Sequence, residues 1–100
     1  MKHFLIKYRF KNGSPEAWRE QIRGFIAALQ NDPELKGKIS YRVIKERDGL
    51  NYYHLASVVD DQANKALSGK DFFKRYVEAT KSVAEGEVVV TPLEIIAETA

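Results

Sequence analysis

Two alternating segments joined by an Asp-Gly pair constrain the fold of this chain more than any other feature. Residues 38–46 and 50–59 are strand-like, and Asp48-Gly49 between them is a strong signal of a tight β-hairpin. If Asp48 and Gly49 are the two turn residues, counting outward sets the register, and one apolar face forms on both strands. The pairs that this register predicts are Ile39 with Val58, Tyr41 with Ala56, and Val43 with His54.

The first third of the chain predicts a strand followed by a helix. Residues 4–10 alternate with period two, which is typical of a half-buried strand. Ser14 is a suitable N-cap, and Pro15 suits the first helical position because it lacks the N–H that would be unpaired there. Apolar residues then recur at helical spacing between positions 18 and 29, and Asp32-Pro33 ends the helix because proline disfavours helical geometry in the residue before it.

The last forty residues predict a second helical region and a final strand. Asp60 or Asp61 can cap a short helical piece, and residues 68–71 (Ser-Gly-Lys-Asp) resemble a capping box that opens a longer helix. The buried stripe of that helix runs from residue 72 to 83. A last strand over residues 88–96 is interrupted by a proline, which cannot donate to a ladder, so we expect a bulge there or an edge position.

The order strand–helix–strand–strand–helix–strand predicts an α+β fold of the ferredoxin-like βαββαβ type. Its four-stranded antiparallel sheet would be covered by helices on one face only. At 100 residues, with 44% hydrophobic and 30% charged residues, the chain has the size and balance of one globular domain spanning 1–100.

The sheet face away from the helices predicts association with a second copy. In the hairpin register it carries the apolar residues Leu5, Ile44, Tyr53, Leu55 and Val59, mixed with polar and basic side chains. Two helices cover only one face of such a sheet, so this surface would meet water in a monomer. We therefore expect a homodimer.

One titratable side chain is predicted to lie between the sheet and the helices. His54 shares the helix-facing side with Tyr41, beneath Trp18 of the first helix and Tyr76 of the second. An imidazole among aromatic rings could act as a base toward an acidic phenol or enol, with Trp18, Tyr41 and Tyr76 shaping a binding pocket. The alternative is a partly buried structural histidine hydrogen-bonded to tyrosine or backbone.

Most other chemical constellations are absent from the sequence. There is no cysteine, the glycines are isolated, and the two histidines lie far apart, so we expect neither a metal site nor a phosphate-cradling loop. The lack of cysteine, of a signal-peptide core and of a long apolar run favours a cytoplasmic protein that does not enter a membrane.

The element order and residues 68–76 (Ser-Gly-Lys-Asp-Phe-Phe-Lys-Arg-Tyr) resemble the dimeric α+β-barrel superfamily, in particular its antibiotic-biosynthesis-monooxygenase-like and stress-responsive A/B-barrel branches. The resemblance spans nearly the whole chain and rests on pattern. It implies two ferredoxin-like sheets packed face to face as a dimeric α+β barrel, with a ligand between each sheet and its own helices.

The resemblance also bears on chemistry. Cofactor-independent monooxygenases of this superfamily oxidise phenolic polyketides that activate oxygen themselves, in pockets lined by aromatic and polar residues. Haem-degrading relatives place a histidine four residues after an aromatic in the second helix. Here those positions hold Tyr76 and Val77, so haem ligation does not carry over and no cofactor is expected.

Three functional readings stay open at this stage. The first is a cofactor-independent monooxygenase or isomerase acting on a small aromatic or hydrophobic compound, and the second is a non-catalytic ligand-binding or accessory module. The third is an RNA-binding domain, because the RNA-recognition motif shares the topology and stacks bases on strand aromatics. The net charge of +2 is interleaved along the chain, and the first strand places Leu5 and Lys7 beside Tyr53, so we expect no specific nucleic-acid partner.

Overall fold

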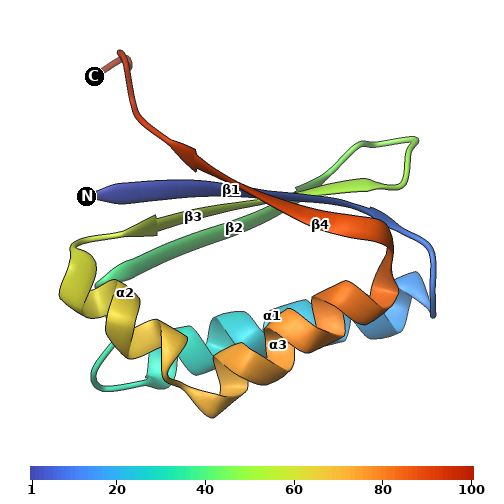
Figure 1. Ribbon diagram of the computed structural model, residues 1–100, viewed down its shortest axis with the longest axis horizontal. Coiled ribbons are helices and arrows are strands. Elements are labelled where there is room, and N and C mark those ends of the chain that lie inside the picture. Colours follow the sequence, from blue (N-terminus) through green and yellow to red (C-terminus); the bar gives the residue numbers. More distant parts are fainter.

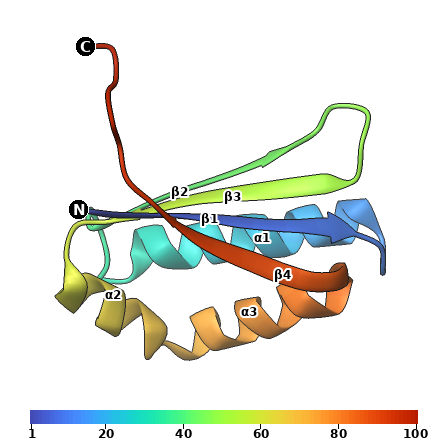
Figure 2. The same cartoon turned by 45° about the horizontal axis from the view of Figure 1, so that its top comes forward.

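The computed structural model describes residues 1–100, and its helices all lie on one face of one sheet (Figures 1 and 2). The sheet has four antiparallel strands in the order β2-β3-β1-β4. This arrangement confirms the ferredoxin-like α+β fold, with the second helical region divided into two helices. The elements are β1 (Lys2–Phe10), α1 (Pro15–Asn31), β2 (Ile39–Lys45), β3 (Asn51–Val58), α2 (Asp61–Ser68), α3 (Asp71–Val83) and β4 (Ala84–Leu93).

The β2–β3 register is confirmed, but the turn that joins the strands is longer than predicted. Ile39 pairs with Val58, Tyr41 with Ala56, and Val43 with His54. The ladder closes at Glu46, whose N–H donates to the Asn51 carbonyl at 3.0 Å, and Gly49 does not have the positive φ of a two-residue turn. The register survives because the longer loop adds one residue on each side of the pair.

Side-chain contacts hold this longer loop. The Lys45 ammonium donates to the carbonyls of Glu46, Arg47 and Gly49 at 2.7, 3.3 and 3.1 Å. The Glu46 carboxylate accepts from the Asn51 amide and the Tyr53 hydroxyl. These contacts satisfy the loop carbonyls without the backbone geometry that an Asp-Gly turn requires.

Two of the three predicted helix caps are confirmed. The Ser14 hydroxyl accepts from the Ala17 N–H at 3.1 Å with Pro15 next to it, and the Asp60 carboxylate accepts from the Ala63 N–H at 2.8 Å. The capping box at residues 68–71 is wrong. Ser68 belongs to the end of α2, where its hydroxyl donates to the Asn64 carbonyl, and the N-cap position of α3 is Lys70, which makes no side-chain cap.

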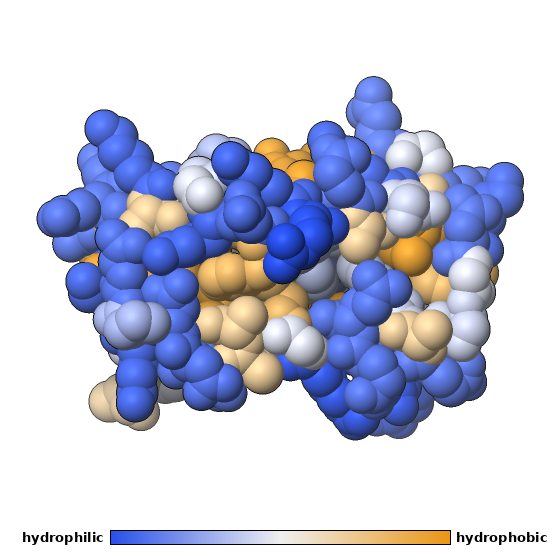
Figure 3. Space-filling view, turned by 90° about the horizontal axis from the view of Figure 1, so that it is seen from below, coloured by the Kyte–Doolittle hydropathy of each residue, from blue (hydrophilic) through white to orange (hydrophobic).

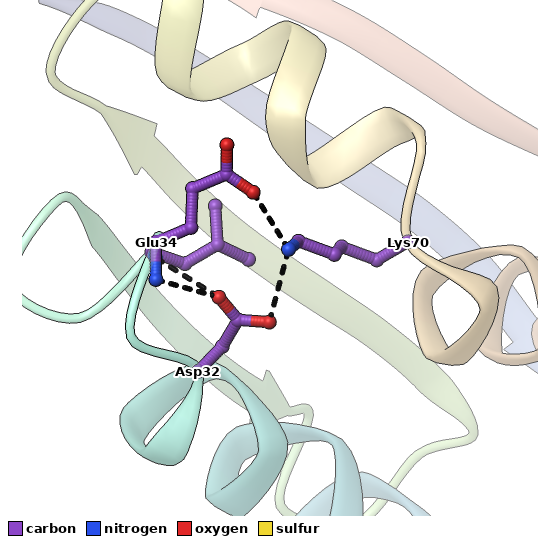
Figure 4. Close-up of polar contacts among 4 residues, drawn as sticks. Asp32, Glu34 and Lys70 are labelled. Carbon is purple, nitrogen blue, oxygen red and sulfur yellow. Dashed lines mark hydrogen bonds and ion pairs between the residues drawn. The ribbon is translucent and has the colours of Figure 1, made fainter.

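Lys70 instead ties the junction between α2 and α3 to the segment after α1 (Figure 4). Its ammonium lies 3.2 Å from Asp32 Oδ2 and 2.7 Å from Glu34 Oε1. The other carboxylate oxygen of Asp32 accepts the backbone N–H of Glu34 and of Leu35. One ammonium therefore holds together two segments that are far apart in sequence.

The last strand begins earlier than predicted and lies at an edge of the sheet. β4 starts at Ala84, directly after α3, and Gly86 has a φ of +72°. Its register against β1 shifts between Lys7 and Arg9, so the irregularity lies near that glycine, while Pro92 pairs opposite Phe4 on the edge strand. The pairing ends at Leu93, and the chain beyond it leaves the sheet on the side away from the helices (Figures 1 and 2).

The core fills the space between the sheet and the helices. Its largest fully buried side chains are Trp18, Leu35, His54 and Val58. The opposite sheet face carries apolar side chains that no helix covers, among them Ile44 and Val89, which are 46% and 50% exposed. None of the helices has the length and hydrophobicity needed to cross a membrane.

Candidate functional site

The candidate site is built around a histidine that is almost fully removed from water. His54 stands in the middle of β3, is 1% exposed, and points toward the helices because its strand alternates between a helix-facing and an outward side. Both ring nitrogens have hydroxyl partners. Nε2 lies 2.8 Å from the Tyr8 hydroxyl, while Nδ1 lies 2.6 Å from the Tyr41 hydroxyl and 3.3 Å from that of Tyr76.

The four side chains come from different elements, and the sheet register brings them together. Tyr8 is on β1, where its neighbour Ile6 pairs with His54, and Tyr41 is on β2, where Val43 pairs with His54. Tyr76 reaches the imidazole from α3 and stacks on the Phe25 ring of α1, with 3.9 Å between ring centroids. The strand register and the packing of α3 on the sheet therefore bring the four side chains together.

Trp18 enters the cluster through Tyr8. Its indole Nε1–H donates to the Tyr8 hydroxyl oxygen at 2.8 Å, and its ring stacks on Tyr76 with a centroid distance of 5.7 Å. The result is a continuous buried chain from Trp18 through Tyr8 and His54 to Tyr41 and Tyr76. Every buried side-chain nitrogen and oxygen in the molecule has at least one hydrogen-bond partner.

A mainly apolar pocket of about 300 Å³ opens beside this series of hydrogen-bonded side chains, between the sheet, α2 and α3. Tyr41, His54 and Tyr76 form a polar part of its wall, whereas Trp18 and Tyr8 do not reach it. Asn64 of α2 and Lys81 of α3 add polar groups elsewhere on the wall. The remaining lining residues are Phe4, Ile6, Ala56, Val58, Leu67, Phe73, Val77, Thr80, Val88 and Val90.

Burial decides the protonation states of the cluster. It lowers the pKa of His54 to about 4, because no carboxylate lies nearby to stabilise the imidazolium. It also raises the pKa of the Tyr8, Tyr41 and Tyr76 hydroxyls well above their ordinary value. At pH 7 the site is therefore a set of neutral hydrogen-bonding groups, suited to a ligand that brings its own polar atom into an apolar cavity.

Three of the four polar side chains around His54, those of Trp18, Tyr41 and Tyr76, were predicted from the sequence. Tyr41 and Tyr76 lie on the pocket wall as predicted, whereas Trp18 does not line the pocket and is connected to His54 only through the Tyr8 hydroxyl. Tyr8, which lies in the alternating segment of residues 4–10, was not predicted as a partner of His54. The signal in the sequence was the strand alternation, which puts Tyr8 on the same side as Ile6, so that a β1–β3 pairing with Ile6 opposite His54 brings Tyr8 within reach of the imidazole.

A second, shallower hollow lies on the helix side of the molecule, where hydrophobic residues are exposed between hydrophilic rims (Figure 3). It is a groove of about 440 Å³ between α1 and α3, and Phe25, Phe72 and Tyr76 contribute its aromatic surface. Tyr76 thus separates the groove from the pocket. The chain has no group of three or more His, Asp or Glu side chains placed to hold a metal ion.

Comparison with known proteins defines the class of fold. No family model matches the sequence, and no curated protein matches it either. Solved structures do match over nearly the whole chain. Rv0793 from Mycobacterium tuberculosis is 15% identical with a TM-score of 0.78, and the match covers 99% of this chain and 98% of that one.

Two further matches carry a functional description. SnoaB from Streptomyces nogalater, a cofactor-independent oxygenase, is 15% identical with a TM-score of 0.77, and 97% of this chain and 94% of that chain are covered. A protein described as an antibiotic biosynthesis monooxygenase is 14% identical with a TM-score of 0.74, covering 97% of this chain and 100% of that one. The chain therefore has the ferredoxin-like fold of antibiotic-biosynthesis-monooxygenase-like proteins.

Titration of His54 tests the burial of the site. The folded-state pKa of about 4 lies below the ordinary 6.5, so between these pH values His54 is protonated in the unfolded chain and neutral in the folded chain. The His54 contribution to stability is thus complete above pH 6.5 and falls by about 3 kcal/mol as the pH drops from 6.5 to 4. Urea unfolding across this range should show the loss in the wild type and in His3→Gln, but not in His54→Gln. An NMR titration midpoint near 6.5 for His54 would contradict the assignment.

Proposed function

We propose that this protein binds a small, mainly apolar aromatic compound in the pocket between its sheet and helices. The observation that carries this proposal is the combination of an apolar cavity of about 300 Å³ with a neutral polar wall of Tyr41, His54 and Tyr76. Such a cavity binds by burial of apolar surface, while the few polar groups orient the ligand.

A matched pair of substitutions on α3 tests where the ligand binds. Val77 is half-buried and lines the pocket, so Val77→Phe should fill part of it and weaken binding of α-naphthol by about tenfold in calorimetry. Lys74→Phe, one turn earlier and exposed to solvent, is the control and should leave the affinity unchanged. Equal affinities for all three proteins, or no binding to the wild type, would contradict the proposal. Native mass spectrometry of the purified protein would identify a ligand that it already carries.

A catalytic role is the second candidate, namely cofactor-independent monooxygenation or isomerisation with His54 as the base. The observation that favours it is the position of a neutral imidazole on the pocket wall, and SnoaB, which shares the fold, is described as a cofactor-independent oxygenase. Burial makes the imidazolium costly, but an oxyanion formed on the ligand would stabilise it. In the oxygenation, a ring CH₂ activated by a phenolate would react with O₂ to give a carbonyl group and water.

Oxygen uptake with an anthrone that carries a phenolic hydroxyl tests this second candidate. The protein should accelerate uptake above the spontaneous rate, and His54→Gln should lower the catalysed rate by about a hundredfold while the protein stays folded. Tyr52→Phe is the control, since Tyr52 is a buried tyrosine outside the pocket and should keep the full rate. A wild-type rate equal to the spontaneous one would leave binding as the function and remove catalysis.

We also propose that a second copy of the chain covers the outer sheet face, as a homodimer. Support comes from the apolar side chains on that face, Leu5, Ile44, Tyr53, Leu55 and Val89, which none of the helices approaches. Flat apolar sheet faces are commonly buried against another layer, and a two-fold pairing of identical faces makes the patch self-complementary.

Sedimentation distinguishes this dimer from a monomer. At micromolar concentration the mass should be about twice 11.4 kDa. Leu55→Lys should shift the protein toward monomer or aggregate, because an unpaired charge buried in an interface costs several kcal/mol. Leu50→Lys, in the β2–β3 loop, is the matched control and should leave the mass unchanged. A monomeric wild type would contradict the proposal.

A further inference from the structure

The buried hydrogen-bond chain has a direction, because one of its ends can only donate. An indole N–H is a donor without acceptor capacity, so the Trp18 contact must run from Nε1 to the Tyr8 oxygen. The Tyr8 O–H hydrogen then needs an acceptor of its own. The only other polar atom in contact with this hydroxyl is Nε2 of His54 at 2.8 Å, and Tyr8 is 2% exposed, so water does not reach it.

This direction sets the tautomer of His54. If Nε2 accepts from Tyr8, the single hydrogen of the neutral imidazole lies on Nδ1, which then donates toward Tyr41 at 2.6 Å. In the opposite tautomer Nε2 would donate to Tyr8, which would already accept from Trp18, and the Tyr8 hydrogen would be buried without a partner. Native proteins rarely leave such a donor unpaired, because no hydrogen bond then offsets the free energy of removing it from water.

Each hydrogen bond from Trp18 to the pocket wall therefore has its donor on the Trp18 side and its acceptor on the pocket side. Since Nδ1 donates, it accepts from neither hydroxyl beside it, and at least one O–H hydrogen of Tyr41 and Tyr76 has no acceptor in the protein. Both tyrosines line the pocket, so this hydrogen faces the cavity, where a ligand or water can accept it, whereas Tyr8 does not line the pocket and its hydrogen has no such alternative. In the opposite tautomer Nδ1 would accept from them, and the same wall would offer acceptors.

We propose that the indole of Trp18 acts through Tyr8 and His54 to make the pocket wall a hydrogen-bond donor, so that the bound compound carries an acceptor oxygen of the ketone or quinone type. The inference rests on the proposed ligand-binding function and specifies its ligand class. Trp18 and Tyr8 are positioning residues here, because neither touches the pocket. For His54 to accept a proton from a ligand at Nδ1, its hydrogen bonds to Tyr8 and Tyr41 have to reverse, and because the Trp18 contact cannot reverse, the Tyr8 hydrogen is then left without an acceptor.

Three bicyclic probes of similar shape test the ligand class. α-Indanone only accepts hydrogen bonds, indole only donates, and indane does neither. In calorimetry the wild type should bind α-indanone about tenfold more tightly than indole, which corresponds to one hydrogen bond gained in a buried site. Equal affinities for the three probes, or a preference for indole, would overturn the inference and leave the binding function intact. Binding of none of them would contradict the proposed function itself.

Substitutions behind the wall test how the preference arises. Trp18→Phe removes the donor that sets the direction, and Tyr8→Phe interrupts the chain while keeping the indole in place, so either should reduce the ketone preference to about twofold or less. Tyr52→Phe removes a hydroxyl outside the chain and should keep the full preference. A preference that persists in Trp18→Phe and Tyr8→Phe would overturn the mechanism, because packing alone does not distinguish a donor from an acceptor.

Nitrogen NMR of the wild type gives a readout that needs neither ligand nor variant. The ring shifts and long-range couplings of His54 identify which nitrogen carries the hydrogen. We expect the hydrogen on Nδ1. A hydrogen on Nε2 would overturn the inference even if every substituted protein failed to fold.

Discussion

A buried imidazole needs a hydrogen-bond partner for each ring nitrogen, and this requirement organises the interior of the protein. His54 lies in a central strand with almost no contact with water, so both partners must come from the protein. Tyr8 satisfies one nitrogen and Tyr41 the other, from the two strands that flank β3. Tyr76 then closes the cluster from the helical layer, so the sheet and the helices meet at one polar point inside an otherwise apolar core.

The position of this polar cluster beside a cavity distinguishes it from an ordinary core network. A network used only for stability would be expected to lie within closely packed side chains, because voids forfeit dispersion contacts. Here the wall of Tyr41, His54 and Tyr76 faces open space between β1, β3 and α3. The helix α2 covers one end of that space and is held by its Asp60 cap and by the ion pairs of Lys70 just beyond it.

Sequence reasoning succeeded where local signals fix geometry and failed where distant segments compete. The β2–β3 register followed from counting outward from Asp48-Gly49, and it placed His54 and Tyr41 on the helix-facing side even though the turn is longer. The Ser14 cap was local too. The supposed cap at Ser68 failed because α2 continues to Ser68, and Lys70 at the N-cap position of α3 pairs with carboxylates after α1, which no nearby sequence reveals. Tyr8 was missed as a partner of His54 because a pairing across more than forty residues has no turn to set its register.

The position of Trp18, the single tryptophan of the chain, makes its fluorescence sensitive to the state of the site. Its indole N–H is bonded to a hydroxyl that is itself bonded to the imidazole, and its ring lies against Tyr76, one of the residues of the pocket wall. Indole emission responds to the local electric field and to nearby quenching groups. A change of charge at His54 or the arrival of a molecule beside Tyr76 should therefore alter both the colour and the lifetime of the fluorescence. Trp18 is therefore an intrinsic fluorescent reporter on the hydrogen bonds that lead to His54.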